Sequence, residues 1–161
     1  MRDILFKAKS ITTGEWVEGS LMYNEDAEEG WEAIIIPCDC NFYVKNDGTG
    51  DIGIEDWYRV DKDTICQYTG LTDKNGNKIW ENDILQFEDT GEDEYKEGFD
   101  FINRARVEFA DARWSLTDFS SNNSAVMEEM YDHLEFKELW QYCEVVGNFF
   151  DNTGIFGGCK V

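Results

Sequence analysis

The chain has 161 residues, and its 35 acidic residues outnumber its 14 basic ones, so the formal net charge at pH 7 is −21. This balance argues against a protein that binds nucleic acid through phosphates, because such contacts need clustered Lys and Arg. Aromatic side chains make up 15% of the sequence, which excludes a disordered acidic chain. We therefore expect a folded, acidic protein with a single domain over residues 1–161.

The sequence also bears on where the protein works. No apolar run approaches the length of a membrane span, and the first residues lack the apolar centre of a signal peptide. The five cysteines are odd in number and lack the spacing of a disulfide framework. Both observations predict a cytoplasmic protein with reduced thiols and no contact with a membrane.

The first part of the chain predicts short β-strands separated by turns. Apolar and polar residues alternate over residues 4–8 and 17–23, as in a half-buried strand. An apolar run over residues 31–36 suits a buried strand. A strand pair is expected over residues 40–45 and 52–60.

The loop within that strand pair contains a G-x-G-x-x-G pattern, formed by Gly48, Gly50 and Gly53. A dinucleotide site needs a helix after this pattern, because the N-terminal amides of the helix hold the pyrophosphate. Here a strand pattern follows, and Asp47 and Asp51 would repel phosphate. We interpret the segment as a hairpin and predict no cofactor.

Residues 67–85 form the most specific motif of the chain. Asn75-Gly76 is the preferred pair for a two-residue type I′ turn, in which both central residues have φ > 0. A second turn is expected at residues 81–83, where Asn82 tolerates a left-handed backbone better than other non-glycine residues. Turn and strand chemistry explains the motif, so we predict a structural role for its residues, which are Tyr68, Gly70, Leu71, Asp73, Asn75, Gly76, Ile79, Trp80, Glu81, Asp83 and Ile84.

This motif resembles the hallmark of the YopX-like proteins, a family carried by bacteriophages and prophages. The resemblance extends more weakly to residues 4–23 and 143–152, and it is weakest over residues 88–123. The family usually has Gly at the position of Asn82, and an aromatic-Glu-Asn run where residues 149–152 stand. The resemblance implies a phage or prophage accessory protein in a bacterial host cell, from a family without an established activity.

The second half of the chain predicts a loop, two strands, a helix and a closing strand. Residues 88–100 are the most acidic stretch and suit a solvated loop. Alternation over residues 104–118 predicts a strand pair. Residues 120–124 supply N-cap candidates for an amphipathic helix that extends to Leu134, and residues 140–150 predict the last strand.

Together these elements predict a mainly β (α+β) fold. Residues 1 to about 87 are expected to form a small SH3-like barrel or a curved antiparallel sheet. Residues 88–103 would be the acidic loop, and residues 104–161 an α+β portion in which one C-terminal amphipathic helix packs on strands.

Few residues are candidates for catalysis or metal binding. Cys38 and Cys40 would share one face of a strand, but zinc needs two further ligands and the sequence has no second pair. The single histidine, His133, would need a partner such as Cys143 to form a nucleophilic pair, and no local signature supports one. We predict no catalytic, metal or cofactor site, with a metal at Cys38 and Cys40 as the alternative.

These observations favour a non-enzymatic protein that acts by binding proteins. The partner would be an unidentified phage or host protein, or a second copy in a homo-oligomer, since aromatic side chains suit such interfaces. One alternative is an acidic mimic of DNA that occupies a host DNA-binding protein. A less favoured alternative is a hydrolase in which His133 meets Cys143 or a buried carboxylate.

Overall fold

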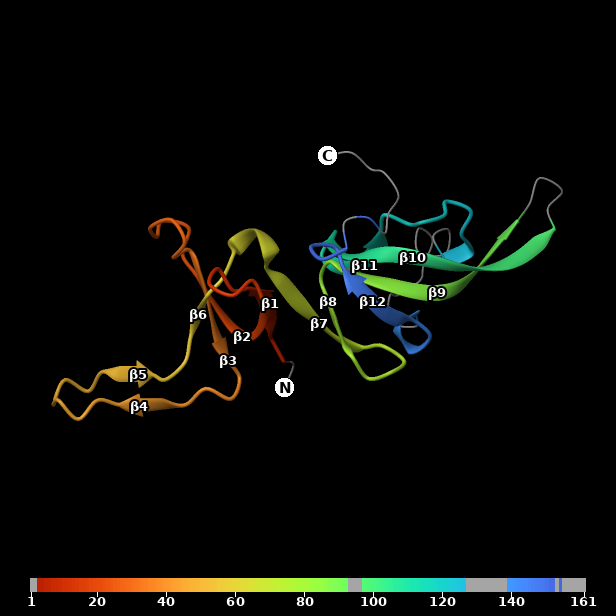
Figure 1. Ribbon diagram of the computed structural model, residues 1–161. Helices are drawn as coiled ribbons and strands as arrows, with labels where there is room; N and C mark the ends of the chain where they lie inside the picture. Colours follow the sequence, from red (N-terminus) through yellow and green to blue (C-terminus); the bar gives the residue numbers. More distant parts are fainter. Residues whose placement is uncertain (1–2, 93–96, 127–138, 153, 155–161) are drawn as a thin grey trace. The chain divides into compact units, whose positions relative to one another are not determined.

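The computed structural model describes residues 3–92, 97–126, 139–152 and 154, and these residues form mainly antiparallel β-strands (Figure 1). The mainly β fold predicted from the sequence is thereby confirmed. The chain divides into two compact units, which we call unit 1 (Met1–Tyr68) and unit 2 (Thr69–Val161). The boundary falls inside one strand, whose first half belongs to unit 1 and whose second half belongs to unit 2.

Unit 1 holds β6, β3, β2, β1 and the first half of β7, which belong to a six-stranded sheet with the order β6-β3-β2-β1-β7-β8. Alternating apolar residues turn inward and form a small core of Ala8, Ala33, Ile35 and Val60. A short 3₁₀ helix, η1 (Lys62–Thr64), leads into the last strand. The strands are β1 (Phe6–Lys9), β2 (Trp16–Tyr23), β3 (Ala33–Pro37), β6 (Tyr58–Arg59) and β7 (Cys66–Thr72).

A separate hairpin extends from this sheet. It consists of β4 (Phe42–Val44) and β5 (Ile52–Ile54), which pair only with each other and project beyond β3 and β6 in Figure 1. Gly48 and Gly50 in its loop have positive φ angles of 81° and 74°. The hairpin interpretation of the glycine pattern is therefore confirmed.

Unit 2 contains a four-stranded antiparallel sheet in the order β11-β10-β9-β12, and it also holds β8, which pairs with β7 at the end of the six-stranded sheet. Its core comprises Ile79, Leu85, Phe87, Ala105, Val107, Leu116, Leu139 and Cys143. A 3₁₀ helix, η2 (Leu139–Gln141), precedes the last strand. The strands are β8 (Lys78–Trp80), β9 (Asp83–Glu92), β10 (Gly98–Ala110), β11 (Arg113–Thr117) and β12 (Glu144–Asn148).

The predicted SH3-like barrel is wrong for the described residues, whereas the alternative of an antiparallel sheet is confirmed. Closure requires the two outer strands of a sheet to pair, and here β6 and β8 lie at opposite ends of the strand order. The strand β6 pairs over two residues only, with Ile34 and Ile35 of β3. The sheet therefore stays open.

The acidic loop predicted over residues 88–103 is also wrong for its described part. There β9 continues to Glu92, and β10 begins at Gly98, opposite Glu92. The reason is a period-two pattern within the acidic stretch: Phe87, Asp89 and Gly91 are buried, and the residues between them are exposed. Among the described strand residues of this stretch, Glu88, Glu92 and Asp100 are exposed, whereas Asp89 is buried.

The predicted C-terminal amphipathic helix falls mainly on residues 127–138, which lie outside the described residues, so the helix is not confirmed. His133 lies in the same segment. The closing strand is shorter than predicted, because residues 139–141 form η2 and the strand begins at Glu144.

Candidate functional site

The motif hairpin between β7 and β8 closes through a different turn from the one predicted. The Gly76 amide donates to the Asp73 carbonyl at 3.0 Å, and the Asp73 amide donates to the Asn77 carbonyl at 2.8 Å. Gly76 has a φ of 85°, whereas Asn75 does not have a positive φ. This is a type I turn followed by a glycine bulge, so the predicted type I′ turn is wrong.

The reason lies in the side chain of Asp73, which is 5% exposed. Its Oδ1 accepts hydrogen bonds from the Asn75 and Asn77 amides, both at 2.9 Å, and its Oδ2 accepts one from Asn77 Nδ2 at 3.1 Å. These bonds require the loop amides to point inward. The carboxylate therefore selects the turn.

Asp73 also connects the turn to a distant strand. Its Oδ2 accepts a hydrogen bond of 3.0 Å from the amide of Val145 in β12, and the Lys74 amide donates to the Cys143 carbonyl at 3.1 Å. Burial by itself would raise the pKa of Asp73, but hydrogen bonds from Val145, Asn77 and Asn75 outweigh it and hold the pKa below the ordinary value of 3.8. The carboxylate is ionised at neutral pH.

Asp83 makes a second connection of the same kind. It is 1% exposed, and its Oδ2 accepts a hydrogen bond of 2.8 Å from the Trp80 amide across the second turn of the motif. Its Oδ1 accepts a hydrogen bond of 2.9 Å from Asn148 Nδ2 in β12. Asn82, which lies between Trp80 and Asp83 in the chain, has a φ of 63°, and this confirms the left-handed backbone predicted there.

In unit 2, the two segments that most closely resemble the YopX-like proteins, which are the motif and residues 143–152, are therefore in direct contact. Strand β12 pairs with β9, with Val145 opposite Leu85 and Asn148 opposite Asp83. We call the two aspartates with their β12 partners, Val145 and Asn148, the carboxylate frame. The frame is a buried set of satisfied hydrogen bonds, and both carboxylates are occupied by donors of the protein itself.

The other motif residues also have conformational or packing roles. Ile79 and Ile84 are completely buried, and Trp80 is 5% exposed. Leu71 packs on the core of unit 2, and Gly70 has a φ of 86°. Tyr68 and Glu81 are half-buried. Burial and backbone conformation thus fit the structural role predicted for these residues, which stays a prediction.

Sequence reasoning missed a third buried polar cluster. Asp89 and Asn103 are 3% and 0% exposed, and Asn103 Nδ2 donates to Asp89 Oδ2 at 2.9 Å. The Ser124 hydroxyl donates to the same carboxylate oxygen, and Asn103 Oδ1 accepts a hydrogen bond of 2.7 Å from the Ser120 hydroxyl. The cluster fastens residues 120–124 to the sheet. The sequence feature that could have revealed this cluster is the period-two pattern of residues 87–91, which places Asp89 on the buried face of a strand.

The cysteines do not form a reactive site within the described residues. Cys38 is exposed, and the Cys40 thiol donates to the Asp56 carbonyl at 3.2 Å. No group of three or more metal-ligating side chains occurs in the described ranges. Cys143 is fully buried, and burial together with the negative charge of Asp73 raises its pKa to about 12. Its thiol is therefore protonated at neutral pH and is a poor nucleophile.

We predict that Cys143 resists alkylation in the folded protein. At pH 8 iodoacetamide should modify Cys143 at least about a hundredfold more slowly than Cys38, because only the thiolate reacts and Cys143 is both buried and protonated. Mass spectrometry of the tryptic peptides measures the two rates. In 8 M urea the two rates should become similar. A fast reaction of Cys143 in the folded protein would restore it as a candidate nucleophile.

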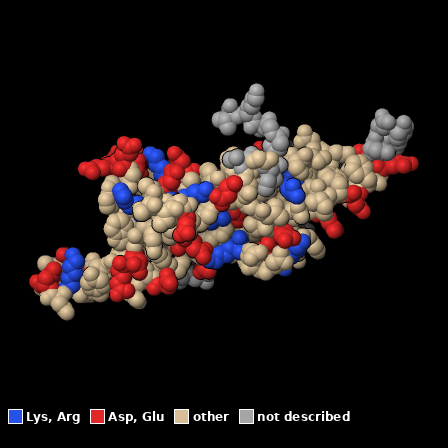
Figure 2. All heavy atoms as spheres, viewed as in Figure 1, with Lys and Arg blue, Asp and Glu red and all other residues tan. Residues whose placement is uncertain are grey.

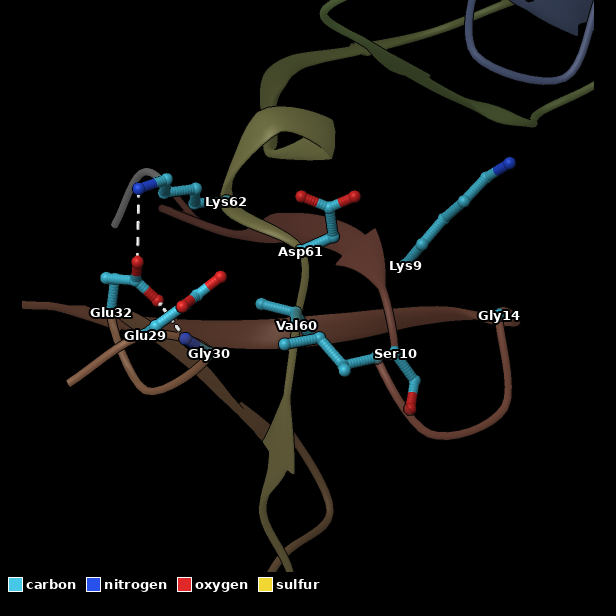
Figure 3. Close-up of a pocket in the computed structure, with 10 residues that line it drawn as sticks. Lys9, Ser10, Gly14, Glu29, Gly30, Glu32, Val60, Asp61 and Lys62 are labelled. Carbon is cyan, nitrogen blue, oxygen red and sulfur yellow. Dashed lines mark hydrogen bonds and ion pairs between the residues drawn. The ribbon is translucent and has the colours of Figure 1, made fainter.

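Unit 1 has a surface pocket of about 500 Å³ (Figure 3). Glu32 accepts hydrogen bonds from Lys62 Nζ at 3.1 Å and from the Gly30 amide at 2.7 Å. Hydrogen bonds from its own backbone and from Lys62 lower the pKa of Glu32, and the bond to Glu32 raises the pKa of Lys62. Lys9 and Asp61 also line the pocket, which contains neither cysteine nor histidine. The ion pair found among these lining charges joins Glu32 and Lys62.

The geometry defines a class of protein: an acidic, antiparallel β protein whose most specific motif is a buried hydrogen-bond frame. The family model described as YopX protein matches residues 5–156, so the chain belongs to the YopX family. The resemblance inferred from the motif is thereby confirmed. No curated protein matches the chain.

One solved structure similar to this chain is the crystal structure of protein EF1440 from Enterococcus faecalis. The two share 20% sequence identity with a TM-score of 0.58, and the match covers 97% of this chain and 99% of that chain. At this identity the likeness shows the fold alone. In the described part of this chain, no helix has the length and apolar character needed to cross a membrane.

Proposed function

We propose that this member of the YopX family is a non-enzymatic protein that acts by binding other proteins. The observation that carries the proposal is the β4–β5 hairpin. Phe42, Val44 and Ile52 are 75%, 65% and 65% exposed, which is unusual for large apolar side chains gathered on one short element. Contiguous exposed apolar residues commonly mark sites of protein–protein interaction.

The hairpin also lacks the support that a two-stranded sheet needs. Two strands alone are marginally stable in water and are stabilised by a third strand or a packed layer. Within the described residues, β4 and β5 pair only with each other, and of their six residues only Gly53 is buried. A bound protein would supply the missing layer.

Several described side chains that could act as acid, base or nucleophile support a non-enzymatic role, because each of them is engaged in contacts within the protein or is protonated. The two most buried motif carboxylates, Asp73 and Asp83, accept hydrogen bonds from the protein itself. The thiol of Cys143 is protonated, and in the pocket of unit 1 Glu32 pairs with Lys62. The hydrolase alternative therefore has no supporting contact among the described residues.

The alternative of a DNA mimic draws on the net charge of −21. Mimicry predicts a row of carboxylates at roughly the spacing of phosphates along one face. On the face shown in Figure 2, the Asp and Glu residues of each unit lie in several separate groups with Lys and Arg among them. This face supports solubility as the role of the charge better than mimicry.

The biological setting belongs to the same proposal. We place the protein in the cytoplasm of a bacterial host as a phage or prophage accessory protein. Its partner there would be a phage protein, a host protein or a second copy of this chain.

Cross-linking followed by affinity capture from bacterial cells that express the tagged chain tests the proposal. We expect the wild-type chain to capture a protein, itself included, that the double variant Phe42→Ser/Ile54→Ser captures at least tenfold less. An Ile102→Ser variant is the matched control, because Ile102 is 55% exposed and lies on β10 of unit 2. Equal capture by all three chains would contradict the proposal.

A further inference from the structure

We infer that Asn75 is a latent site of spontaneous deamidation, which the Asp73 carboxylate keeps unreactive while the motif turn is closed. The inference concerns a chemical modification and does not rest on the proposed binding function. It gives Asp73 a second role beside folding, which is to control when a neighbouring residue is modified.

Asn75 has the chemistry that this modification needs. It is followed by Gly76, and this is the only Asn-Gly pair in the sequence. Glycine has no side chain to hinder its own amide nitrogen, and a Cβ placed at Gly76 would meet no atom within 4 Å. Both residues are exposed, so water reaches the site. Within the described residues, Asn75 is tied to the protein through its backbone amide and not through its side chain.

The reaction consumes one water and releases one ammonia. The backbone nitrogen of Gly76 loses its proton and attacks Cγ of Asn75, and the bond from Cγ to the side-chain nitrogen breaks as ammonia leaves. The intermediate is a five-membered succinimide ring. Water then opens the ring at either of its two carbonyls, which leaves aspartate at position 75 or an isoaspartate whose Cβ has become part of the main chain.

The closed turn holds the two reacting atoms apart. Asn75 is the third residue of the type I turn that begins at Asp73, and ψ at this place is about 0° in such turns. Ring closure requires a very different ψ, at which the Gly76 nitrogen eclipses Cβ about the Cα–C bond and reaches Cγ. The Gly76 amide also donates to the Asp73 carbonyl at 3.0 Å, which retains the proton that has to leave.

The side chain of Asp73 maintains this geometry. Its Oδ1 accepts hydrogen bonds from the amides of Asn75 and Asn77, both at 2.9 Å, which lie on the two sides of Gly76. Its Oδ2 accepts a hydrogen bond of 3.0 Å from the Val145 amide, which also fixes the turn to β12. A rotation about ψ of Asn75 would carry the Asn77 amide away from the carboxylate. Deamidation therefore needs a local opening of the turn.

The modified turn fits the carboxylate frame less well than the original. Isoaspartate lengthens the main chain by one carbon between the two amides that share Asp73 Oδ1. Aspartate and isoaspartate both add a negative charge to the turn that the Asp73 carboxylate closes, where like charges repel. The modification thus converts a brief opening of the turn into a lasting weakening of the frame.

Incubation of the chain at pH 8 and 37 °C, followed by mass spectrometry of proteolytic peptides, tests the inference. Asn75 should deamidate at least about tenfold more slowly in the folded wild type than in 8 M urea, where it should be the fastest asparagine of the chain. Asp73→Asn should raise the rate without urea at least about tenfold, because the turn loses the acceptor that holds it closed.

Two controls separate opening of the turn from unfolding of the whole chain. Leu116→Ala weakens the core of unit 2 from β11 and removes no hydrogen bond of the turn, so it should raise the rate less than about threefold. In the wild type, the rate should stay nearly constant between 0 and 1 M urea, because a local opening exposes little surface.

Equal rates at Asn75 in the folded wild type and in 8 M urea would overturn the inference, since the turn would then give no protection. The same holds if Asp73→Asn folds, as judged by circular dichroism, and leaves the rate unchanged. An equal acceleration by Leu116→Ala, or a steep rise of the wild-type rate between 0 and 1 M urea, would assign the reaction to global unfolding and remove Asp73 as its control.

Discussion

Replacing Asp83 with alanine should lower the free energy of unfolding by about 4 kcal/mol, the largest effect expected in this protein. Asp83 is 1% exposed and accepts hydrogen bonds from the Trp80 amide and Asn148 Nδ2. Alanine leaves both donors buried without this acceptor, and each unsatisfied buried donor costs about 1–3 kcal/mol. Urea denaturation followed by circular dichroism at pH 7 measures the loss.

The matched control is Glu88→Ala, because Glu88 lies on the same strand, β9, and is exposed. This change should alter the free energy of unfolding by less than about 0.5 kcal/mol. If Asp83→Ala cost as little as Glu88→Ala, the hydrogen bonds of Asp83 would not support the fold, and a role for the motif in binding would have to be considered again.

Asp73→Asn should lower the free energy of unfolding by about 3 kcal/mol at pH 7. The amide that replaces one carboxylate oxygen is a donor, and it would face backbone amides of Asn75, Asn77 or Val145, which are donors as well. The comparison is Glu144→Gln, which removes the charge from a 3.0 Å ion pair between Lys74 and Glu144 that is nearly half exposed. An exposed pair contributes about 0–1 kcal/mol.

The cost of Asp73→Asn should also depend on pH in one direction. The folded state lowers the pKa of Asp73 below 3.8, so its contribution to stability is fully present well above that pH and is lost as the pH falls through the folded pKa. The difference between wild type and variant should be constant from pH 8 to pH 5.5 and should shrink below about pH 4. Unfolding curves at each pH measure it, at low concentration because the isoelectric point is near 4.1. A difference that shrinks between pH 8 and pH 5.5 would contradict this sign.

Much of the β-structure could be predicted from the sequence, because its strands alternate in the ordinary way. The strands β1, β2 and β3 follow directly from apolar alternation and from the run that ends at Pro37. The continuation of β9 and β10 through the acidic stretch was missed, because carboxylates suggested a solvated loop. There the buried positions are filled by Phe87, Asp89 and Gly91, two of which do not look like core residues.

A structural role for the motif could be predicted from the sequence, but the contacts that its individual residues make could not. Turn chemistry placed Asn82 correctly in the left-handed region, but it assigned Asn75 to a type I′ turn that the Asp73 carboxylate excludes. A type I′ turn pattern of two positive φ angles occurs instead at Asp111 and Ala112, between β10 and β11. The contacts from the motif to β12 could not be predicted, since Asp73 and Val145 are 72 positions apart.

The central claim is that the motif of this family member fastens two distant segments of unit 2 together. A double-mutant cycle between Asp83 and Asn148 tests this claim most directly. From Asp83→Ala, Asn148→Ala and the double variant, we expect a coupling energy of about 1.5 kcal/mol or more. Additive effects of the two substitutions would contradict the account.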